Sequence, residues 1–83
     1  MAVYVDNMKA RYRNMIMCHM MADTVDELHA MADKIGVVRR HFQDTKYKHY
    51  DICLSKRILA VRYGAIELDA KELVRMFRGR EVK

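Results

Sequence analysis

Apolar and polar residues change their spacing several times along this chain, and each spacing predicts a different element. Two short apolar blocks rich in β-forming residues, 2–6 (AVYVD) and 14–20 (NMIMCHM), predict strands. The polar and basic stretch 7–13 between them predicts a loop. Apolar residues fill successive positions of the second block, which is typical of a central strand buried on both faces.

Helix starts are marked twice by a capping box, in which the first side chain and an acid three residues later bind free backbone N–H groups. Thr24 and Glu27 form the first box, and Gly36 ends the helix that follows. Its inward face carries apolar residues at helical spacing: Val25, Leu28, Met31, Ala32 and Ile35. His29 lies beside that face, where it borders the core or a pocket.

The second capping box, Asp69 and Glu72, predicts a last helix that ends at Gly79. Four of its residues are expected to face inward: Ala70, Leu73, Val74 and Phe77. Residues 37–42 (VVRRHF) and 65–68 (AIEL) predict strands, and the aperiodic stretch 43–50 predicts a loop. This order of elements indicates one small α/β domain over 1–83, with 79–83 frayed. We expect about three helices and a three- or four-stranded sheet that is mixed or partly parallel.

A helix over 55–63, capped by Ser55 and ended by Gly64, breaks a local electrostatic rule. Lys56 and Arg57 occupy its first turn, where the positive end of the helix dipole disfavours cations. An anion bound between these side chains and the free N–H groups would compensate. The alternative is that both cations bend into water or pair with Asp51.

The composition is that of a folded domain. The 83-residue chain is 52% hydrophobic, and no stretch has the length of a membrane span or the apolar segment of a signal peptide. We therefore expect a cytoplasmic protein whose Cys18 and Cys53 are reduced thiols that fill the core.

The net charge of +5 is concentrated in the middle of the chain. Residues 37–62 carry seven basic and two acidic side chains: Arg39, Arg40, Lys46, Lys48, Lys56, Arg57 and Arg62, against Asp44 and Asp51. A localised basic surface favours phosphate-bearing or acidic partners. The same run of charge is also compatible with a solvated surface that serves only solubility.

Titratable residues near the ends of predicted elements form the candidate site. We expect His19, His49 and Asp51 to be catalytic, because histidine beside a carboxylate moves protons or binds a divalent metal near neutral pH. The candidate ligand-binding residues are Asp6, Asp23, His29, Lys48, Tyr50, Lys56 and Arg57.

No motif assigns a metal or a cofactor. The chain has no HExxH, no paired CxxC and no glycine-rich phosphate loop, and Cys18, His19, His49 and Cys53 match no standard zinc spacing. The methionine-rich stretch 15–21 is interpreted as core filling rather than as copper or haem ligands. The sequence leaves metal binding and enzymatic activity open.

Five segments, VYVD, CHMMAD, ELHAMADKIG, HYDI and KRILAVRYGA, carry a family resemblance. The chain resembles an uncharacterised family of short bacterial and bacteriophage proteins, a domain of unknown function, from Val3 to about Val74. The resemblance implies that the polar residues of these segments belong together: Asp6, His19, Asp23, Glu27, His29, His49, Tyr50, Asp51 and Arg57. The phage members imply an accessory role in the infected cell, and the family indicates no reaction.

Two classes of function agree with these features. The first is a small cytoplasmic protein that binds a nucleotide or a nucleic acid at the His/Asp/Arg cluster, with hydrolysis as a further step. The second is a non-catalytic module that docks its basic face, including Tyr47 and Tyr50, on an acidic host protein. A homodimer through the methionine-rich strand is compatible with both, and we expect no membrane association.

Overall fold

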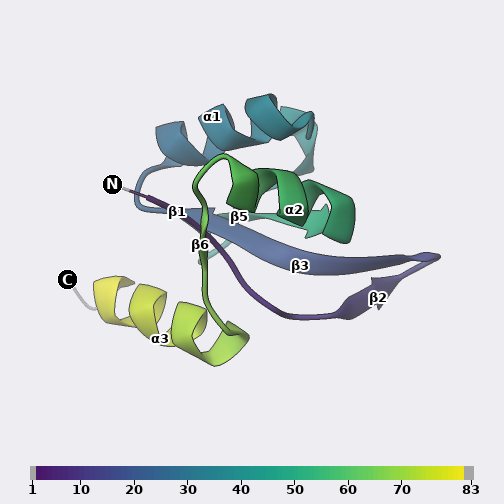
Figure 1. Ribbon diagram of the computed structural model, residues 1–83. Helices are drawn as coiled ribbons and strands as arrows, with labels where there is room; N and C mark the ends of the chain where they lie inside the picture. Colours follow the sequence, from purple (N-terminus) through teal and green to yellow (C-terminus); the bar gives the residue numbers. More distant parts are fainter. Residues whose placement is uncertain (1, 82–83) are drawn as a thin grey trace.

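The computed structural model describes residues 2–81, with six strands and three α-helices (Figure 1). The strands are β1 (Val3–Val5), β2 (Ala10–Tyr12), β3 (Met15–Ala22), β4 (Phe42–Gln43), β5 (His49–Cys53) and β6 (Ile66–Glu67). The helices are α1 (Val25–Ile35), α2 (Leu54–Arg62) and α3 (Ala70–Glu81), and a short 3-10 turn, η1, covers Arg39–His41. The predicted α/β class and the three helices are confirmed, and the sheet has more strands than expected.

The strands form one mixed sheet in the order β4-β5-β3-β1-β6, with β2 paired to the outer end of β3. β1 and β6 run parallel, and the other pairs are antiparallel. β3 is the central strand, as its apolar run predicted. Because β5 pairs with one edge of β3 and β1 and β2 with the other, most of this strand has no open edge through which a homodimer could form.

Helices α1 and α2 cover one face of the sheet, and α3 lies against the other (Figure 1). The core lies under α1 and α2, where the cross-strand neighbours Val5, Met20 and Tyr50 are each 0% exposed. On the opposite face, the Tyr4 ring meets the Phe77 ring of α3 edge to face, with centroids 6.0 Å apart. Within residues 2–81, every helix falls short of the length and apolar character that a bilayer span requires.

Both predicted helix starts are confirmed. The second is a full capping box, whereas at the first the Glu27 carboxylate contacts the Thr24 hydroxyl rather than the Thr24 backbone N–H. At the start of α1, the Glu27 N–H donates to the Thr24 hydroxyl (3.2 Å), which in turn donates to the Glu27 carboxylate (2.9 Å). At the start of α3, the Glu72 N–H donates to the Asp69 carboxylate (2.7 Å), and the Asp69 N–H donates to the Glu72 carboxylate (3.2 Å). Gly36 ends α1 at a φ of 79°, a left-handed conformation that glycine adopts without strain.

The ends of α2 and α3 differ from the prediction. α2 begins at Leu54 rather than Ser55, and its N-cap residue, Cys53, makes no side-chain capping hydrogen bond. α3 continues through Gly79 to Glu81, so the predicted end of this helix at Gly79 is wrong. A glycine inside a helix costs only about 1 kcal/mol, which neighbouring turns can offset. Residues 82 and 83 lie outside the described residues.

Two of the residues expected to face inward do not. Val25 in the first turn of α1 is 37% exposed, and Val74 in α3 is 44% exposed. Leu73, one position before Val74, is 2% exposed and carries the main apolar contact of α3. Helical spacing therefore predicted which side of each helix is buried. How many residues on that side are buried depends on how the helix packs on the sheet.

The predicted strand over 37–42 is wrong for all but its last residue, because η1 covers Arg39–His41 and Phe42 begins β4. Arg39 pairs with Asp33 of α1 at 2.9 Å, which ties this segment to the end of that helix. The strand lies at β5, most of which comes after the predicted loop 43–50. In β5, Tyr50 and Ile52 are buried while Asp51 between them is exposed, a two-residue alternation typical of a strand. The predicted loop 7–13 also contains β2.

Candidate functional site

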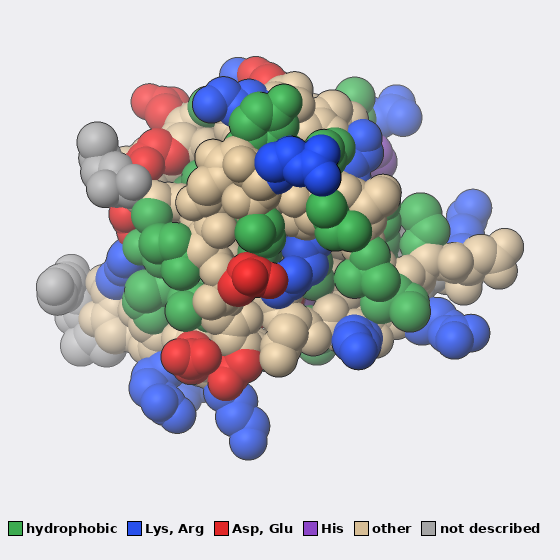
Figure 2. Space-filling model, viewed as in Figure 1, with side chains coloured by type: hydrophobic (Ala, Val, Ile, Leu, Met, Phe, Trp, Pro, Cys, Tyr) green, Lys and Arg blue, Asp and Glu red, His purple; other side chains and the backbone are tan. Residues whose placement is uncertain are grey.

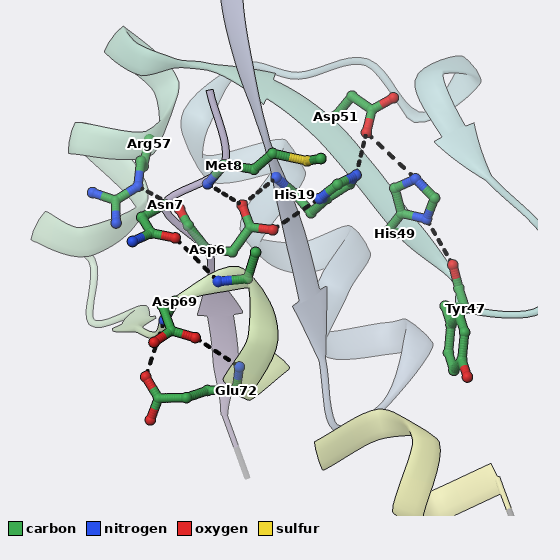
Figure 3. Close-up of polar contacts among 11 residues, drawn as sticks. Asp6, Asn7, Met8, His19, Tyr47, His49, Asp51, Arg57, Asp69 and Glu72 are labelled. Atoms are coloured by element: carbon green, nitrogen blue, oxygen red, sulfur yellow. Dashed lines mark hydrogen bonds and ion pairs between the residues drawn. The ribbon is translucent and has the colours of Figure 1, made fainter. Parts of the chain in front are cut away.

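Three strands place four polar side chains on the sheet face opposite α1 and α2 (Figure 3). His19 of β3 is the cross-strand partner of Asp51 of β5. On the other side of β3, the Asp6 N–H donates to the His19 carbonyl at 3.1 Å. Directly opposed residues of antiparallel strands point to the same face, and His49, two residues before Asp51, shares that face. The strand register therefore assembles the cluster.

His19 is held by the buried carboxylate of Asp6, which is 1% exposed. Its Nδ1 lies 2.8 Å from Asp6 Oδ2, while Asp6 Oδ1 accepts the His19 N–H (2.9 Å) and the Met8 N–H (3.2 Å). A carboxylate only accepts hydrogen bonds, so Nδ1 of His19 carries the hydrogen. In the neutral ring, Nε2 then presents a lone pair, and it faces Asp51 Oδ1 at 3.7 Å.

His49 is oriented by a backbone carbonyl in the same manner. Its Nδ1 lies 2.6 Å from the Tyr47 carbonyl oxygen, which also only accepts. Nδ1 of His49 therefore carries the hydrogen, and Nε2 faces Asp51 Oδ1 at 3.4 Å. The two imidazole rings meet edge to face, with centroids 5.1 Å apart.

Three electron-pair donors thus converge: His19 Nε2, His49 Nε2 and one oxygen of Asp51 lie within 4.8 Å of one another. The nitrogen–oxygen separations of 3.4 and 3.7 Å are too long for good hydrogen bonds. They are close to the ligand spacing of a tetrahedral zinc site, because bonds of about 2.0–2.1 Å set the ligand atoms about 3.3 Å apart. The cluster has the donor types and spacing for a divalent transition metal.

Electrostatics links Asp6 and His19 as a pair. Hydrogen bonding to Asp6 raises the pKa of His19 above its usual range, against the opposing effect of burial. Burial alone would raise the pKa of Asp6, but the hydrogen bonds with the His19 side chain and backbone hold it below the usual range. Asp6 is therefore a carboxylate at neutral pH and an acceptor for the His19 ring.

Arg57 pairs with groups other than Asp51, the partner considered as the alternative to a bound anion. Its Nε donates to the Asp6 carbonyl oxygen (2.8 Å) and its Nη1 to Glu67 Oε1 (2.9 Å). Asp51 instead faces the two histidines. The Lys56 side chain reaches Gly36 at the end of α1 instead. Its Nζ would lie 3.2 Å from a Cβ atom placed on Gly36. Arg57 reaches the cluster only through the backbone of Asp6.

Two predicted ligand-binding residues lie on the opposite face of the sheet. Tyr50 is 0% exposed, and its hydroxyl lies 2.7 Å from Nδ1 of His29. The His29 ring also packs against Phe42, with centroids 4.8 Å apart. Tyr50 therefore has no surface to offer a ligand or a protein partner, and His29 completes a polar contact at the core edge.

Asp23 and Lys48 lie away from the histidines. Asp23 accepts hydrogen bonds from the Ala2 N–H (2.7 Å) and the Tyr4 hydroxyl (2.9 Å), and it pairs with Arg80 at 2.7 Å. Lys48 pairs with Asp44 four residues earlier. The basic residues do not gather in one field either: Figure 2 shows lysine and arginine side chains over the tip of the β2–β3 hairpin and over α3 as well.

Sequence reasoning missed the carbonyl of Tyr47 and the orienting role of Asp6. Asp6 stood among the ligand-binding candidates, whereas its carboxylate is turned inward onto the His19 ring. The alternation of His49, Tyr50 and Asp51 could have revealed the strand and the shared face of His49 and Asp51. A backbone carbonyl contact leaves no trace in residue identity.

The fold and the cluster define a small mixed α/β domain that presents two histidines and an aspartate from one sheet face, backed by a buried second aspartate. Residues 3–80 match the family described as "Protein of unknown function (DUF4031)", and the chain belongs to that family. The match confirms the resemblance to a domain of unknown function, over residues 3–80. Searches of curated proteins and of solved structures return no match.

Proposed function

We propose that this protein binds a divalent transition metal ion, zinc foremost, and uses it to bind and hydrolyse a phosphate-bearing ligand. The observation that carries this proposal is the convergence of His19 Nε2, His49 Nε2 and Asp51 Oδ1 within 4.8 Å. Two imidazoles and one carboxylate are a common protein donor set for zinc and neighbouring metals.

The second shell supports the same proposal. Metal-binding histidines almost always donate their other ring N–H to a carboxylate or a backbone carbonyl, which fixes the tautomer and the ring orientation. His19 makes this contact with Asp6 and His49 makes it with the Tyr47 carbonyl. Both Nε2 atoms are thereby left as acceptors that point at a third acceptor, the Asp51 carboxylate. A cation between the three removes that mismatch.

Three protein ligands leave a fourth tetrahedral position for water or substrate. A metal held by His19, His49 and Asp51 would lower the pKa of a bound water to about 7 and would supply the nucleophile for hydrolysis of a phosphate ester. Hydrolysis would consume one water molecule, break the bond between phosphorus and the ester oxygen, pass a proton to the leaving oxygen, and release phosphate and an alcohol. The metal would also offset the charges of Asp51 and of the phosphate.

The ligand class rests on charge. A net charge of +5 attracts anions, and Lys46 and Lys48 lie three residues and one residue before His49 in the chain. The free thiols Cys18 and Cys53 support the cytoplasm as the location, and a phage-related accessory role forms part of this proposal.

Zinc titration of the apoprotein by calorimetry tests the metal site. Wild type and His41→Ala should each bind one zinc ion per chain, since His41 is an exposed histidine in η1. His49→Ala should bind at least about 100-fold more weakly, because it removes a ligand. Equal affinity in all three proteins would contradict the proposal.

Hydrolysis has its own test, with p-nitrophenyl phosphate and bis-p-nitrophenyl phosphate as substrates. We expect metal-dependent release of p-nitrophenol that a chelator abolishes and that Asp51→Asn loses. Release that does not depend on added metal, or no release from a zinc-loaded protein, excludes the hydrolytic step and leaves binding alone.

A non-catalytic interaction module is the second candidate function. One observation favours it: Leu54 and Ile58, one turn apart on α2, are 42% and 59% exposed, and exposed apolar side chains beside basic ones suit a protein partner. Under this alternative, zinc and the variants of His49 and Asp51 leave partner affinity unchanged, whereas Ile58→Ser weakens it.

A further inference from the structure

We propose that the cleft between the start of α1, the 46–48 segment and α3 receives the base of a nucleotide whose phosphate lies at the His19, His49 and Asp51 cluster. The inference rests on the proposed function and gives its substrate a chemical class. The cleft has a volume of about 290 Å³, at the lower end of small-molecule sites.

The lining of the cleft combines apolar and charged side chains. Val25 and Leu28 of α1 and Phe77 of α3 are apolar, and Lys46, Lys48 and Arg80 are cationic. Leu28 is 2% exposed, so the apolar part of the lining joins the core. A cleft lined by both kinds of side chain fits a ligand with a flat apolar body and a negative charge.

Tyr47 joins this cleft to the metal cluster. Its backbone carbonyl accepts the hydrogen of His49 Nδ1 at 2.6 Å, and the same residue lines the cleft. In Figure 3 its ring points away from Asp51, on the far side of His49. Tyr47 and His49 are two residues apart, so their backbones lie at most about 7 Å apart along the chain.

The aromatic rings favour a base over an aliphatic chain. Tyr47 and Phe77 offer ring surfaces at the cleft, and base–aromatic stacking is a general mode of nucleotide and single-strand binding. Both rings are backed by cations: Arg80 Cζ lies 4.6 Å from the Phe77 centroid, and Lys46 Nζ lies 5.9 Å from the Tyr47 centroid. Asp23, the acid of this cleft, is paired with Arg80 at 2.7 Å and so repels an anionic ligand less.

The test compares adenosine 5′-monophosphate, ribose 5-phosphate and adenosine, titrated into zinc-loaded protein. We expect AMP to bind about tenfold more tightly than ribose 5-phosphate, since one stacked base contributes that much, and adenosine to bind most weakly. Tyr47→Leu should abolish the preference for AMP. Zinc affinity is measured beside it, because the Tyr47 backbone carbonyl also orients His49. Tyr47→Phe should keep the preference.

Tyr63→Leu is the matched control, because Tyr63 is 53% exposed and lines a different hollow. It should bind all three ligands as wild type does. A 5′-phosphorylated tetranucleotide distinguishes two sources of the same group: tighter binding than AMP supports the end of a nucleic-acid strand, and equal or weaker binding supports a free nucleotide.

Three results overturn the inference. If AMP and ribose 5-phosphate bind equally to wild type, the cleft does not hold a base, while metal and phosphate binding still stand. If Tyr47→Leu keeps the preference for AMP, the base lies elsewhere. Failure of both phosphates to bind zinc-loaded protein removes the proposed function itself, and the inference with it.

Discussion

The Nδ1 atom of His19 lies 2.8 Å from the carboxylate of Asp6, which is 1% exposed. The two residues come from different strands, and their contact decides which nitrogen of His19 faces Asp51. The same carboxylate accepts the backbone N–H groups of His19 and Met8, so Asp6 holds the turn after β1 as well as the ring. One buried acid thus connects the fold of the sheet edge to the candidate metal centre.

Replacing Asp6 by Asn should weaken zinc binding by about 10–100-fold, the usual effect of losing a second-shell partner. The amide oxygen can still accept the backbone bonds, but the amide NH₂ facing His19 favours the tautomer with a hydrogen on Nε2. Zinc affinity can be measured by competition with a chromophoric chelator, and circular dichroism checks the fold. A folded Asp6→Asn protein with wild-type zinc affinity would show that Asp6 is structural only.

Zinc should raise the thermal stability of the wild-type protein. At a free concentration of 100 times Kd, binding adds about 2.7 kcal/mol to the free energy of unfolding, or roughly 10–20 °C in Tm for a domain of this size. Asp51→Asn should lose most of the shift, and Asp44→Asn, which alters an acid paired with Lys48, should keep it. Cys53→Ser should also keep it; a lost shift there would assign zinc to the thiol.

Arg57→Lys should lower the free energy of unfolding by about 1–2 kcal/mol, because a lysine cannot make both the Asp6 carbonyl and Glu67 contacts of the guanidinium. Arg62→Lys, at an exposed position on the same helix, should change it little. Chemical denaturation measures both. Unchanged stability with weakened phosphate binding would instead support an anion grip at the start of α2.

Thr24→Ala should reduce the free energy of unfolding by about 1 kcal/mol. The change removes the hydroxyl that accepts the Glu27 N–H at 3.2 Å and exposes a free donor at the start of α1. Urea denaturation with an unchanged slope gives the value. A loss near zero would mean that water replaces this cap without penalty.

Asp23 should make stability depend on acid pH. Burial alone would raise its pKa, but hydrogen bonds from Tyr4, Arg80 and the Ala2 N–H hold it below the usual range. A carboxyl with a depressed folded-state pKa stabilises the fold above its unfolded pKa of about 3.9 and loses that contribution as pH falls through the folded value. The stability difference between wild type and Asp23→Asn should therefore be largest at neutral pH and shrink below about pH 4. A difference that is constant from pH 7 to pH 3 contradicts this account.

Parts of the site were visible in the sequence. The sequence marks His19, His49 and Asp51 as candidates because they are titratable and lie near the ends of predicted elements. The structure brings their ligand atoms within 4.8 Å of one another. Tyr50 lies between His49 and Asp51 in the chain, yet its side chain is buried on the other face of the sheet, where its hydroxyl contacts His29. Proximity in sequence cannot separate the two sets, because alternate residues of one strand point in opposite directions.

The sequence by itself determined what local hydrogen bonding and period control: the helix caps at Thr24 and Asp69, the left-handed stop at Gly36 and the α/β class. These features depend on contacts within a few residues, which the order of side chains specifies directly. Only the tertiary structure decided that β5 pairs with β3 and that His19 lies opposite Asp51. Strand pairing joins residues far apart in the chain, and a shift of one residue would turn every side chain of β5 to the other face.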